Sequence, residues 1–115
     1  MLWWRLDSRL LKANARQAIE AADRVFVSSA SAWEVAIKMS LGRLILKDPF
    51  ARLVERAGFE ELPIAFRHAE RLRNLAPHHA DPFDRMLLAQ AMADGLTLVT
   101  HDRTLEPYGI PTVWT

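Results

Sequence analysis

Apolar residues recur at two different spacings along the 115-residue chain, and stretches of the two kinds alternate. Spacings of three and four residues predict helices, which we expect over residues 7–22, 31–41, 48–58, 66–75 and 81–94. Short runs of β-branched and aromatic residues predict strands, which we expect over residues 24–28, 62–65, 96–100 and 111–114. The alternation indicates an α/β fold around a mostly parallel sheet.

The expected sheet indicates both the domain organisation and the place of a site. Residues 1–115 contain no linker, low-complexity tract or charge block, so we expect a single domain with one core. Pro63 argues that strand 62–65 lies at an edge, because proline cannot donate a ladder hydrogen bond. Active sites in such sheets collect at the carboxyl ends of the strands, so polar residues near those ends are the candidates.

The helix expected from Asp81 carries one more acid in its first turn than a cap requires. The sequence Asp81-Pro82-Phe83-Asp84-Arg85 places Asp81 at the N-cap and Asp84 at the third helical position. Segment 48–51 has the same cap and proline but carries alanine where Asp84 stands. The cap therefore does not account for Asp84, for which helix-dipole stabilisation and metal binding remain the alternatives.

Three acidic residues share a structural context at the expected strand ends. Glu34 lies in the helix after strand 24–28. Asp84 begins the helix that leads into strand 96–100, and Asp102 follows that strand. In a parallel sheet all three converge on one edge, where clustered carboxylates repel one another unless a cation neutralises them. Carboxylate oxygens without cysteine ligands suit Mg²⁺ or Mn²⁺, and these ions serve phosphodiester hydrolysis.

The other acids, like Asp84, also have plain structural interpretations. Ser31 and Glu34 match a capping box, in which Glu34 returns a hydrogen bond to the start of the helix. Asp81 is explained more simply as a cap than as a metal ligand, and Asp102 suits an ordinary turn. These alternatives stay open.

The residues beside the acids give weaker indications of function. His101 either contacts phosphate or lies in a solvated loop, and Arg85 either pairs with a neighbouring acid or contacts phosphate. We expect Trp33 and Phe83 in the core and His68 on a polar helix.

Composition excludes several classes of protein. The chain has no cysteine, which rules out disulfides, thiolate zinc sites and cysteine nucleophiles. A net charge of +1 neither demands nor excludes a nucleic-acid partner. No apolar run reaches the length of a membrane span, and the N-terminus lacks the pattern of a signal peptide, so we expect a cytoplasmic protein.

Four segments together resemble the PIN-domain family, and most closely its VapC-type toxins. In chain order they are SASAWEVAIK (29–38), LGRL (41–44), DPFDR (81–85) and LVTHD (98–102). The resemblance covers essentially the whole chain and implies a PIN-like three-layer α/β/α fold. It implies a Mg²⁺- or Mn²⁺-dependent endoribonuclease that cuts structured RNA such as tRNA or rRNA, a homodimer, and a cognate antitoxin that covers the site.

The same resemblance implies roles for particular residues. Three acids fall on the family's second, third and fourth acidic positions and would be catalytic and metal-binding: Glu34, Asp84 and Asp102. The residues given a secondary place at the site are Asp81, Arg85 and His101.

One part of the family pattern has no counterpart in this chain. The family begins with a strand that ends in its first metal-binding aspartate, whereas segment 2–4 resembles the helix that follows. We therefore expect a sheet that lacks its central strand, weakened metal binding and low nuclease activity. A misassigned start, a truncation and a degenerate gene product are the alternative origins. The competing functional hypothesis is a catalytically impaired PIN remnant that binds antitoxin, a paralogue or RNA.

Overall fold

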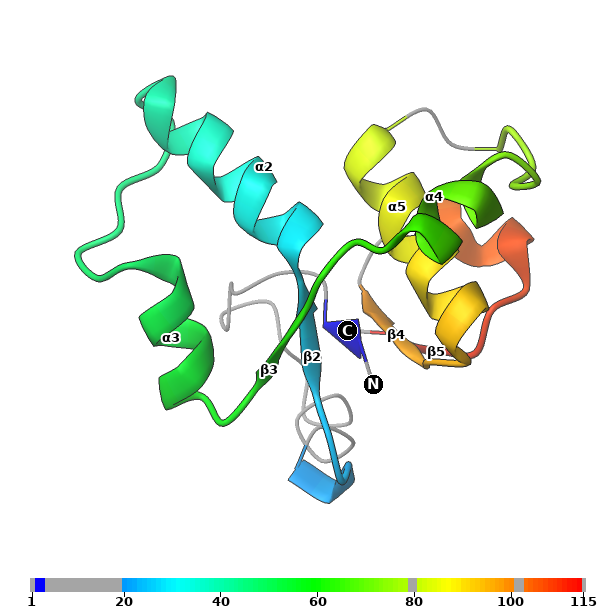
Figure 1. The fold of residues 1–115 in the computed structure, drawn as a ribbon, viewed down its shortest axis with the longest axis horizontal. Helices are drawn as coiled ribbons and strands as arrows, with labels where there is room; N and C mark the ends of the chain where they lie inside the picture. Colours follow the sequence, from blue (N-terminus) through cyan, green and yellow to red (C-terminus); the bar gives the residue numbers. More distant parts are fainter. Residues whose placement is uncertain (1, 4–19, 79–80, 101–102, 115) are drawn as a thin grey trace.

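Five strands form one parallel sheet in the order β3-β2-β1-β4-β5 (Figure 1). This computed structural model describes residues 2–3, 20–78, 81–100 and 103–114. Its strands are β1 (Leu2–Trp3), β2 (Phe26–Ser28), β3 (Glu60–Leu62), β4 (Leu98–Thr100) and β5 (Thr112–Trp114). Each neighbouring pair is parallel, so all five carboxyl ends lie at the same edge of the sheet. We call it the carboxyl edge.

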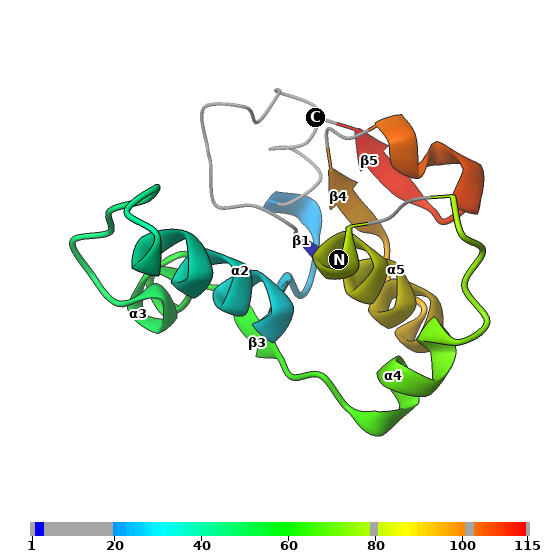
Figure 2. The same cartoon turned by 90° about the horizontal axis from the view of Figure 1, so that it is seen from above.

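The helices lie between the strands in sequence. They are α2 (Ser29–Ser40), α3 (Phe50–Arg56), α4 (Phe66–Leu72), α5 (Pro82–Asp94) and the short 3-10 helix η2 (Arg103–Tyr108). In Figure 2, α5 lies on one side of β4 and β5, and α2 contacts α5. α4 packs against α5, and α3 packs against β3. The α/β fold with a parallel sheet expected from the sequence is therefore confirmed.

The main core lies where α5 meets the sheet. Seven buried side chains form it, from β3, the end of the α4 region, α5, β4 and η2: Leu62, Leu75, Leu87, Leu88, Ala91, Leu98 and Leu105. The α5 members recur at helical spacing, and Leu88 has no exposed surface. Fully burying such a leucine contributes about 1.5–3 kcal/mol. This packing holds α5 in place against the sheet.

α5 has the boundaries that its sequence predicts. Asp81 is its N-cap and accepts hydrogen bonds from the N–H groups of Phe83 and Asp84 at 2.8 and 3.2 Å. Pro82 occupies the first helical position, where no N–H is needed. Gly95 ends the helix in the left-handed region at φ 63°, which suits glycine.

Two other helix starts differ from the prediction. α2 begins at Ser29, earlier than expected, because Ser28 caps it. α3 begins at Phe50 with Pro49 at the N-cap, and the Asp48 carboxylate bonds Arg56 at 3.0 Å instead of a helix N–H. Segment 48–51 is therefore not a second copy of the Asp81 cap, and that comparison was wrong.

The remaining expected elements are found close to their predicted places. The expected strand at 62–65 is β3, shifted to Glu60–Leu62, and it lies at an edge of the sheet as Pro63 suggested. The expected helix at 7–22 lies outside the described residues except for its end, where residues 20 and 21 are helical.

The centre of the sheet is occupied, contrary to expectation. β1 pairs with β2 on one side, Leu2 opposite Phe26, and with β4 on the other, Leu2 opposite Leu98. The prediction of an absent central strand, and of Leu2 and Trp3 in a helix, was wrong. Both strands flanking this position need a hydrogen-bonding partner, and segment 2–3 provides it.

Within the described part of the chain, the helices are too short or too polar to cross a membrane.

Candidate active site

Two helices begin at the carboxyl edge of the sheet. Ser28 ends β2 and caps α2, and its Oγ accepts a hydrogen bond from the N–H of Ala30 at 3.0 Å. α5 reaches the same edge from the other direction, because a short turn at Gly95 joins its carboxyl end to the amino end of β4. The amino ends of α2 and α5, which favour anionic groups, therefore lie at one edge.

An aromatic contact joins these two helix starts. The rings of Trp33 and Phe83 lie edge to face, with centroids 5.1 Å apart and planes at 73°. Each aromatic residue directly precedes one of the predicted acids, Glu34 on α2 and Asp84 on α5. Trp33 is 61% exposed, so its expected place in the core was wrong. The contact holds the first turns of α2 and α5 beside each other.

Asp84 is the buried acid of the site. It occupies the third position of α5 and is only 3% exposed. Its neighbour Asp81 already caps the helix, so the cap does not explain a second acid. Because burying an ionised carboxylate is costly, such a group is expected to serve donors or a cation.

Glu34 lies farther along α2 and is more accessible. Its side chain is 17% exposed and accepts a hydrogen bond from Lys38 Nζ at 3.3 Å. Because Ser28 is the N-cap, Ser31 lies inside the first turn, and the capping-box interpretation of Glu34 was wrong. Lys38 is 46% exposed, and such ion pairs contribute about 0–1 kcal/mol, so a ligand or cation can replace Lys38 at little cost.

Arg85 holds the segment that leads into α5. Its guanidinium donates to the carbonyl oxygens of Ala76 and Leu75 at 3.1 and 3.4 Å. The Tyr108 hydroxyl donates to the same Ala76 carbonyl at 2.8 Å. These carbonyl partners were not among the alternatives that the sequence suggested. Arg85 and Asp81 together fix the start of α5, on which Asp84 lies.

Two of the predicted site residues, His101 and Asp102, lie outside the described residues. The structure thus places two of the three predicted acids, Glu34 and Asp84, on adjoining helices at the carboxyl edge. In the described ranges alone, no group of three or more histidine, aspartate and glutamate residues is placed to hold a metal ion.

Buried hydroxyl groups at the same edge escaped the sequence reasoning. Ser28 and Thr100 end β2 and β4 and are 1% and 2% exposed, and Ser31 in α2 is also buried. A hydroxyl oxygen can coordinate Mg²⁺, and its O–H group can donate a hydrogen bond to a phosphate oxygen. The available signal was a hydroxyl residue that ends an apolar strand.

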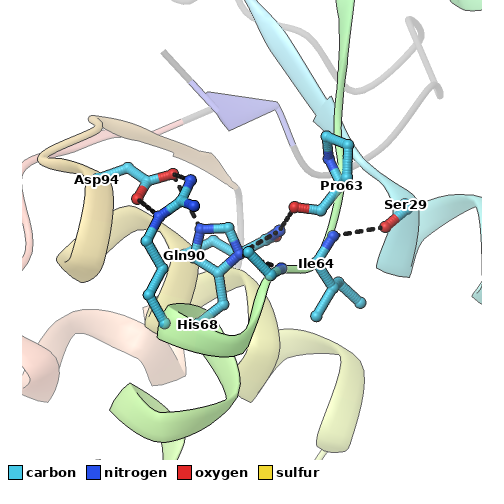
Figure 3. Close-up of polar contacts among 8 residues, drawn as sticks. Ser29, Pro63, Ile64, His68, Gln90 and Asp94 are labelled. Atoms are coloured by element: carbon cyan, nitrogen blue, oxygen red, sulfur yellow. Dashed lines mark hydrogen bonds and ion pairs between the residues drawn. The ribbon is translucent and has the colours of Figure 1, made fainter.

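A second polar cluster lies at the opposite end of α5 (Figure 3). His68 lies on a polar, mostly exposed helix, as expected, but its own side chain has no exposed surface. Its Nδ1 accepts from the Ala65 N–H at 2.9 Å, which leaves Nε2 to donate to Asp94 at 2.9 Å. Arg67 donates twice to Asp94, at 2.9 and 3.1 Å.

The charge of Asp94 is stabilised within this cluster. The hydrogen bonds from Arg67, and then that from His68, lower the pKa of Asp94 from its ordinary 3.8 to about 2. Gln90 extends the cluster, since its Nε2 donates to the Pro63 carbonyl at 3.4 Å. Figure 3 also shows Ser29, whose Oγ accepts from the Ile64 N–H at 3.2 Å. The cluster fastens α4 and the segment after β3 to α5 and α2.

Comparison with known proteins gives one family. The sequence profile of the PIN domain matches residues 1–110. The chain is 33% identical to Ribonuclease VapC22 of Mycobacterium tuberculosis over 122 residues, covering 97% of this chain and 91% of that protein.

Solved structures share the fold at lower sequence identity. A toxin–antitoxin complex from Klebsiella pneumoniae superposes with a TM-score of 0.61 at 23% identity, covering 97% of this chain and 94% of the other. FitAcB from Neisseria gonorrhoeae gives a TM-score of 0.61 at 17% identity, with coverage of 100% and 97%. VapBC2 from Rickettsia felis, bound to a promoter DNA fragment, gives 0.58 at 13%, with coverage of 98% of both chains.

Proposed function

The chain belongs to the PIN domain family, and from this membership we propose that it is a metal-dependent endoribonuclease, the toxin of a toxin–antitoxin pair. The observation that carries the proposal is Asp84, a buried acid in the first turn of a helix that Asp81 already caps. It lies at the carboxyl edge of a parallel sheet, on the helix that adjoins that of Glu34. The identity of the relative named a ribonuclease supports the choice of reaction.

We assign the metal to Mg²⁺ or Mn²⁺, held by Asp84, Glu34 and Asp102. The donors fit such an ion, because they are carboxylate oxygens in a chain without cysteine and one of them is buried. When bound, a divalent ion lowers the pKa of a coordinated water and stabilises charge on the phosphate. The protein's own part is to hold Asp84 at the start of a packed helix and to provide the Glu34 carboxylate, from which a cation would displace Lys38.

The proposed substrate is a structured RNA of the tRNA or rRNA class, and the proposed inhibitor is a cognate antitoxin. Toxin–antitoxin complexes among the structural neighbours support the second partner. An apolar surface on α2 and the following loop suits a protein partner, with exposed side chains at Ile37, Met39, Leu41 and Ile45. Beside α2 a pocket of about 360 Å³ is lined by residues of β2, α2, α3 and β3, and its apolar members include Val27, Phe50 and Val54.

Three further parts of the proposal rest on the family and on composition. We propose that the protein is a homodimer, that residues 1–115 form one domain, and that it acts in the cytoplasm, where a chain without cysteine needs no oxidising environment.

The test of the site is Asp84→Asn, assayed by Mn²⁺-dependent cleavage of a tRNA pool. We expect kcat/KM to fall on the order of a hundredfold or more, because one metal ligand is lost. The matched control is Asp48→Asn, which makes the same chemical change at a partly exposed carboxylate on the α3 side. We expect this control to cleave like the parent protein.

Two outcomes would count against parts of this proposal. If Asp84→Asn lowers only the melting temperature and leaves cleavage intact, the acid is structural. If the unmodified protein binds RNA or antitoxin but does not cleave at any Mn²⁺ concentration, the protein is a binding module, which was the competing hypothesis.

A further inference from the structure

An arginine and a tryptophan stack at the carboxyl edge, beyond the acids of the proposed site. The guanidinium carbon of Arg103 lies 4.4 Å from the centroid of the Trp114 ring. Arg103 begins η2, three residues after the end of β4, and Trp114 ends β5. Trp114 is in register with Thr100 on the neighbouring strand. The pair therefore belongs to the same edge of the sheet as Asp84.

This edge needs a positive charge if it is to receive a polyanion. Its described acids, Glu34, Asp81 and Asp84, repel a phosphate backbone. Lys38 is already bonded to Glu34 at 3.3 Å, and Arg85 donates to two main-chain carbonyls. Arg85 is therefore occupied within the protein, and Lys38 is occupied as long as no cation takes its place at Glu34.

Arg103 is in a different position. It is exposed, and within the described ranges no carboxylate forms an ion pair with it. The contact with the Trp114 ring restrains the guanidinium, and a guanidinium that lies over a ring can still donate hydrogen bonds from its N–H groups. A planar, immobilised guanidinium is suited to two-point binding of phosphate and loses little freedom when it binds.

We infer that Arg103, held by Trp114, is a substrate-positioning residue that binds a phosphate of the RNA beside the scissile bond. This inference rests on the proposed ribonuclease function, because the ligand is the RNA of that reaction. Trp114 acts through Arg103 by fixing the orientation of the guanidinium.

The chain contains a matched pair that separates this role from simple stabilisation. Arg24 stacks on Phe26 with its guanidinium carbon 4.8 Å from the ring centroid. That pair lies at the amino end of β2, which begins at Phe26. Arg24 also donates to both carboxylate oxygens of Glu60 at 2.8 and 2.9 Å. Like Arg103→Ala, Arg24→Ala removes one positive charge and one arginine–aromatic contact. It does so at the amino edge of the sheet, away from the proposed RNA site.

The experiment measures binding of a fluorescein-labelled RNA hairpin by anisotropy in EDTA, where cleavage does not interfere, at several salt concentrations. For Arg103→Ala we expect affinity to fall about fivefold and the slope of log K against log salt to flatten by roughly 0.7, the loss of one single-strand phosphate contact. Arg103→Lys should keep the slope but bind more weakly than the parent. Arg24→Ala should match the parent in both measurements.

Cleavage kinetics give a second readout. With Mn²⁺ present, Arg103→Ala should raise KM and leave kcat nearly unchanged, which a loss of folding would not do. The inference is overturned if Arg103→Ala and Arg24→Ala bind RNA equally, or if the parent protein does not bind the hairpin. Absence of cleavage by a parent protein whose binding depends on Arg103 would overturn the proposed nuclease function alone.

Discussion

Asp81 and Asp84 are three residues apart and differ in role because their carboxylates meet different groups. Asp81 is satisfied by two helix N–H groups, whereas Asp84 is buried one turn farther on. The sequence favoured Asp84 through a comparison with segment 48–51 that the structure overturns. The hydrogen bonds of Asp81 to the helix N–H groups lead to the same conclusion, that the cap does not require Asp84. Side-chain partners of this kind depend on contacts far apart in sequence, which is why the sequence could not assign those of Arg85 or His68.

Asp94 gives a prediction of pH dependence. Its pKa is lowered to about 2, so its contribution to folding is fully present above pH about 4 and is lost as the pH falls through about 2, at a cost of about 2 kcal/mol. In urea titrations from pH 6 to pH 2, the unmodified protein should lose this amount of unfolding free energy relative to Asp94→Asn.

The control for this titration is Asp48→Asn, whose carboxylate pairs with Arg56 and is 40% exposed. Its difference from the unmodified protein should stay small across the same range. Equal pH dependence in the protein and in Asp94→Asn would show that the Arg67–His68–Asp94 cluster does not stabilise the fold.

Among the elements, those with strong local signals were predicted best. α5 was placed almost to the residue because Asp81, Pro82 and Gly95 act within one or two turns of the helix. The start of α2 was misplaced because three serines stand close together in segment 28–31, and only the backbone decides that Ser28 is the cap. Local sequence therefore predicted the ends of a helix well where single residues mark them, and poorly where several residues could serve as the N-cap.

Gly95 gives a prediction at this scale. Its φ of 63° lies in the left-handed region, and a Cβ there would meet no heavy atom within 4 Å. Gly95→Ala should therefore destabilise the protein by about 1 kcal/mol through backbone strain alone. Thermal unfolding should show the loss, and RNA cleavage by the folded variant should be unchanged, since Gly95 lies at the end of α5 remote from Asp84.

A result contrary to this would be informative. If Gly95→Ala is as stable as the parent protein, the turn tolerates another conformation.

At the scale of the whole molecule, the alternation of predicted helices and strands was enough to predict the fold class, but it did not predict the order of the strands in the sheet. Nothing in the local pattern of Leu2 and Trp3 indicates a strand, because two residues are too few to show a period. Their pairing is decided by the vacant position between β2 and β4. That Glu34 and Asp84 lie near one edge could be expected from the sequence, because parallel strands end at a common edge, whereas their role as a site stays a prediction.

The proposed metal site gives a prediction for the molecule as a whole. A ligand that binds only the folded state raises its stability, by about 2.7 kcal/mol at a concentration a hundredfold above Kd. Mn²⁺ should therefore raise the melting temperature by roughly 5 °C or more, and EDTA should reverse the rise. Asp84→Asn should show no such rise, and an equal rise in this variant would place the metal elsewhere.

The pairing of β1 has a consequence for synthesis of the protein. Leu2 lies beside Leu98, so the middle of the sheet joins residues from nearly opposite ends of the chain. On the ribosome, the first residues must wait for almost the entire chain to emerge before β4 can pair with them. The sheet that positions Asp84 and Arg103 is therefore completed only after most of the chain between β1 and β4 has been made.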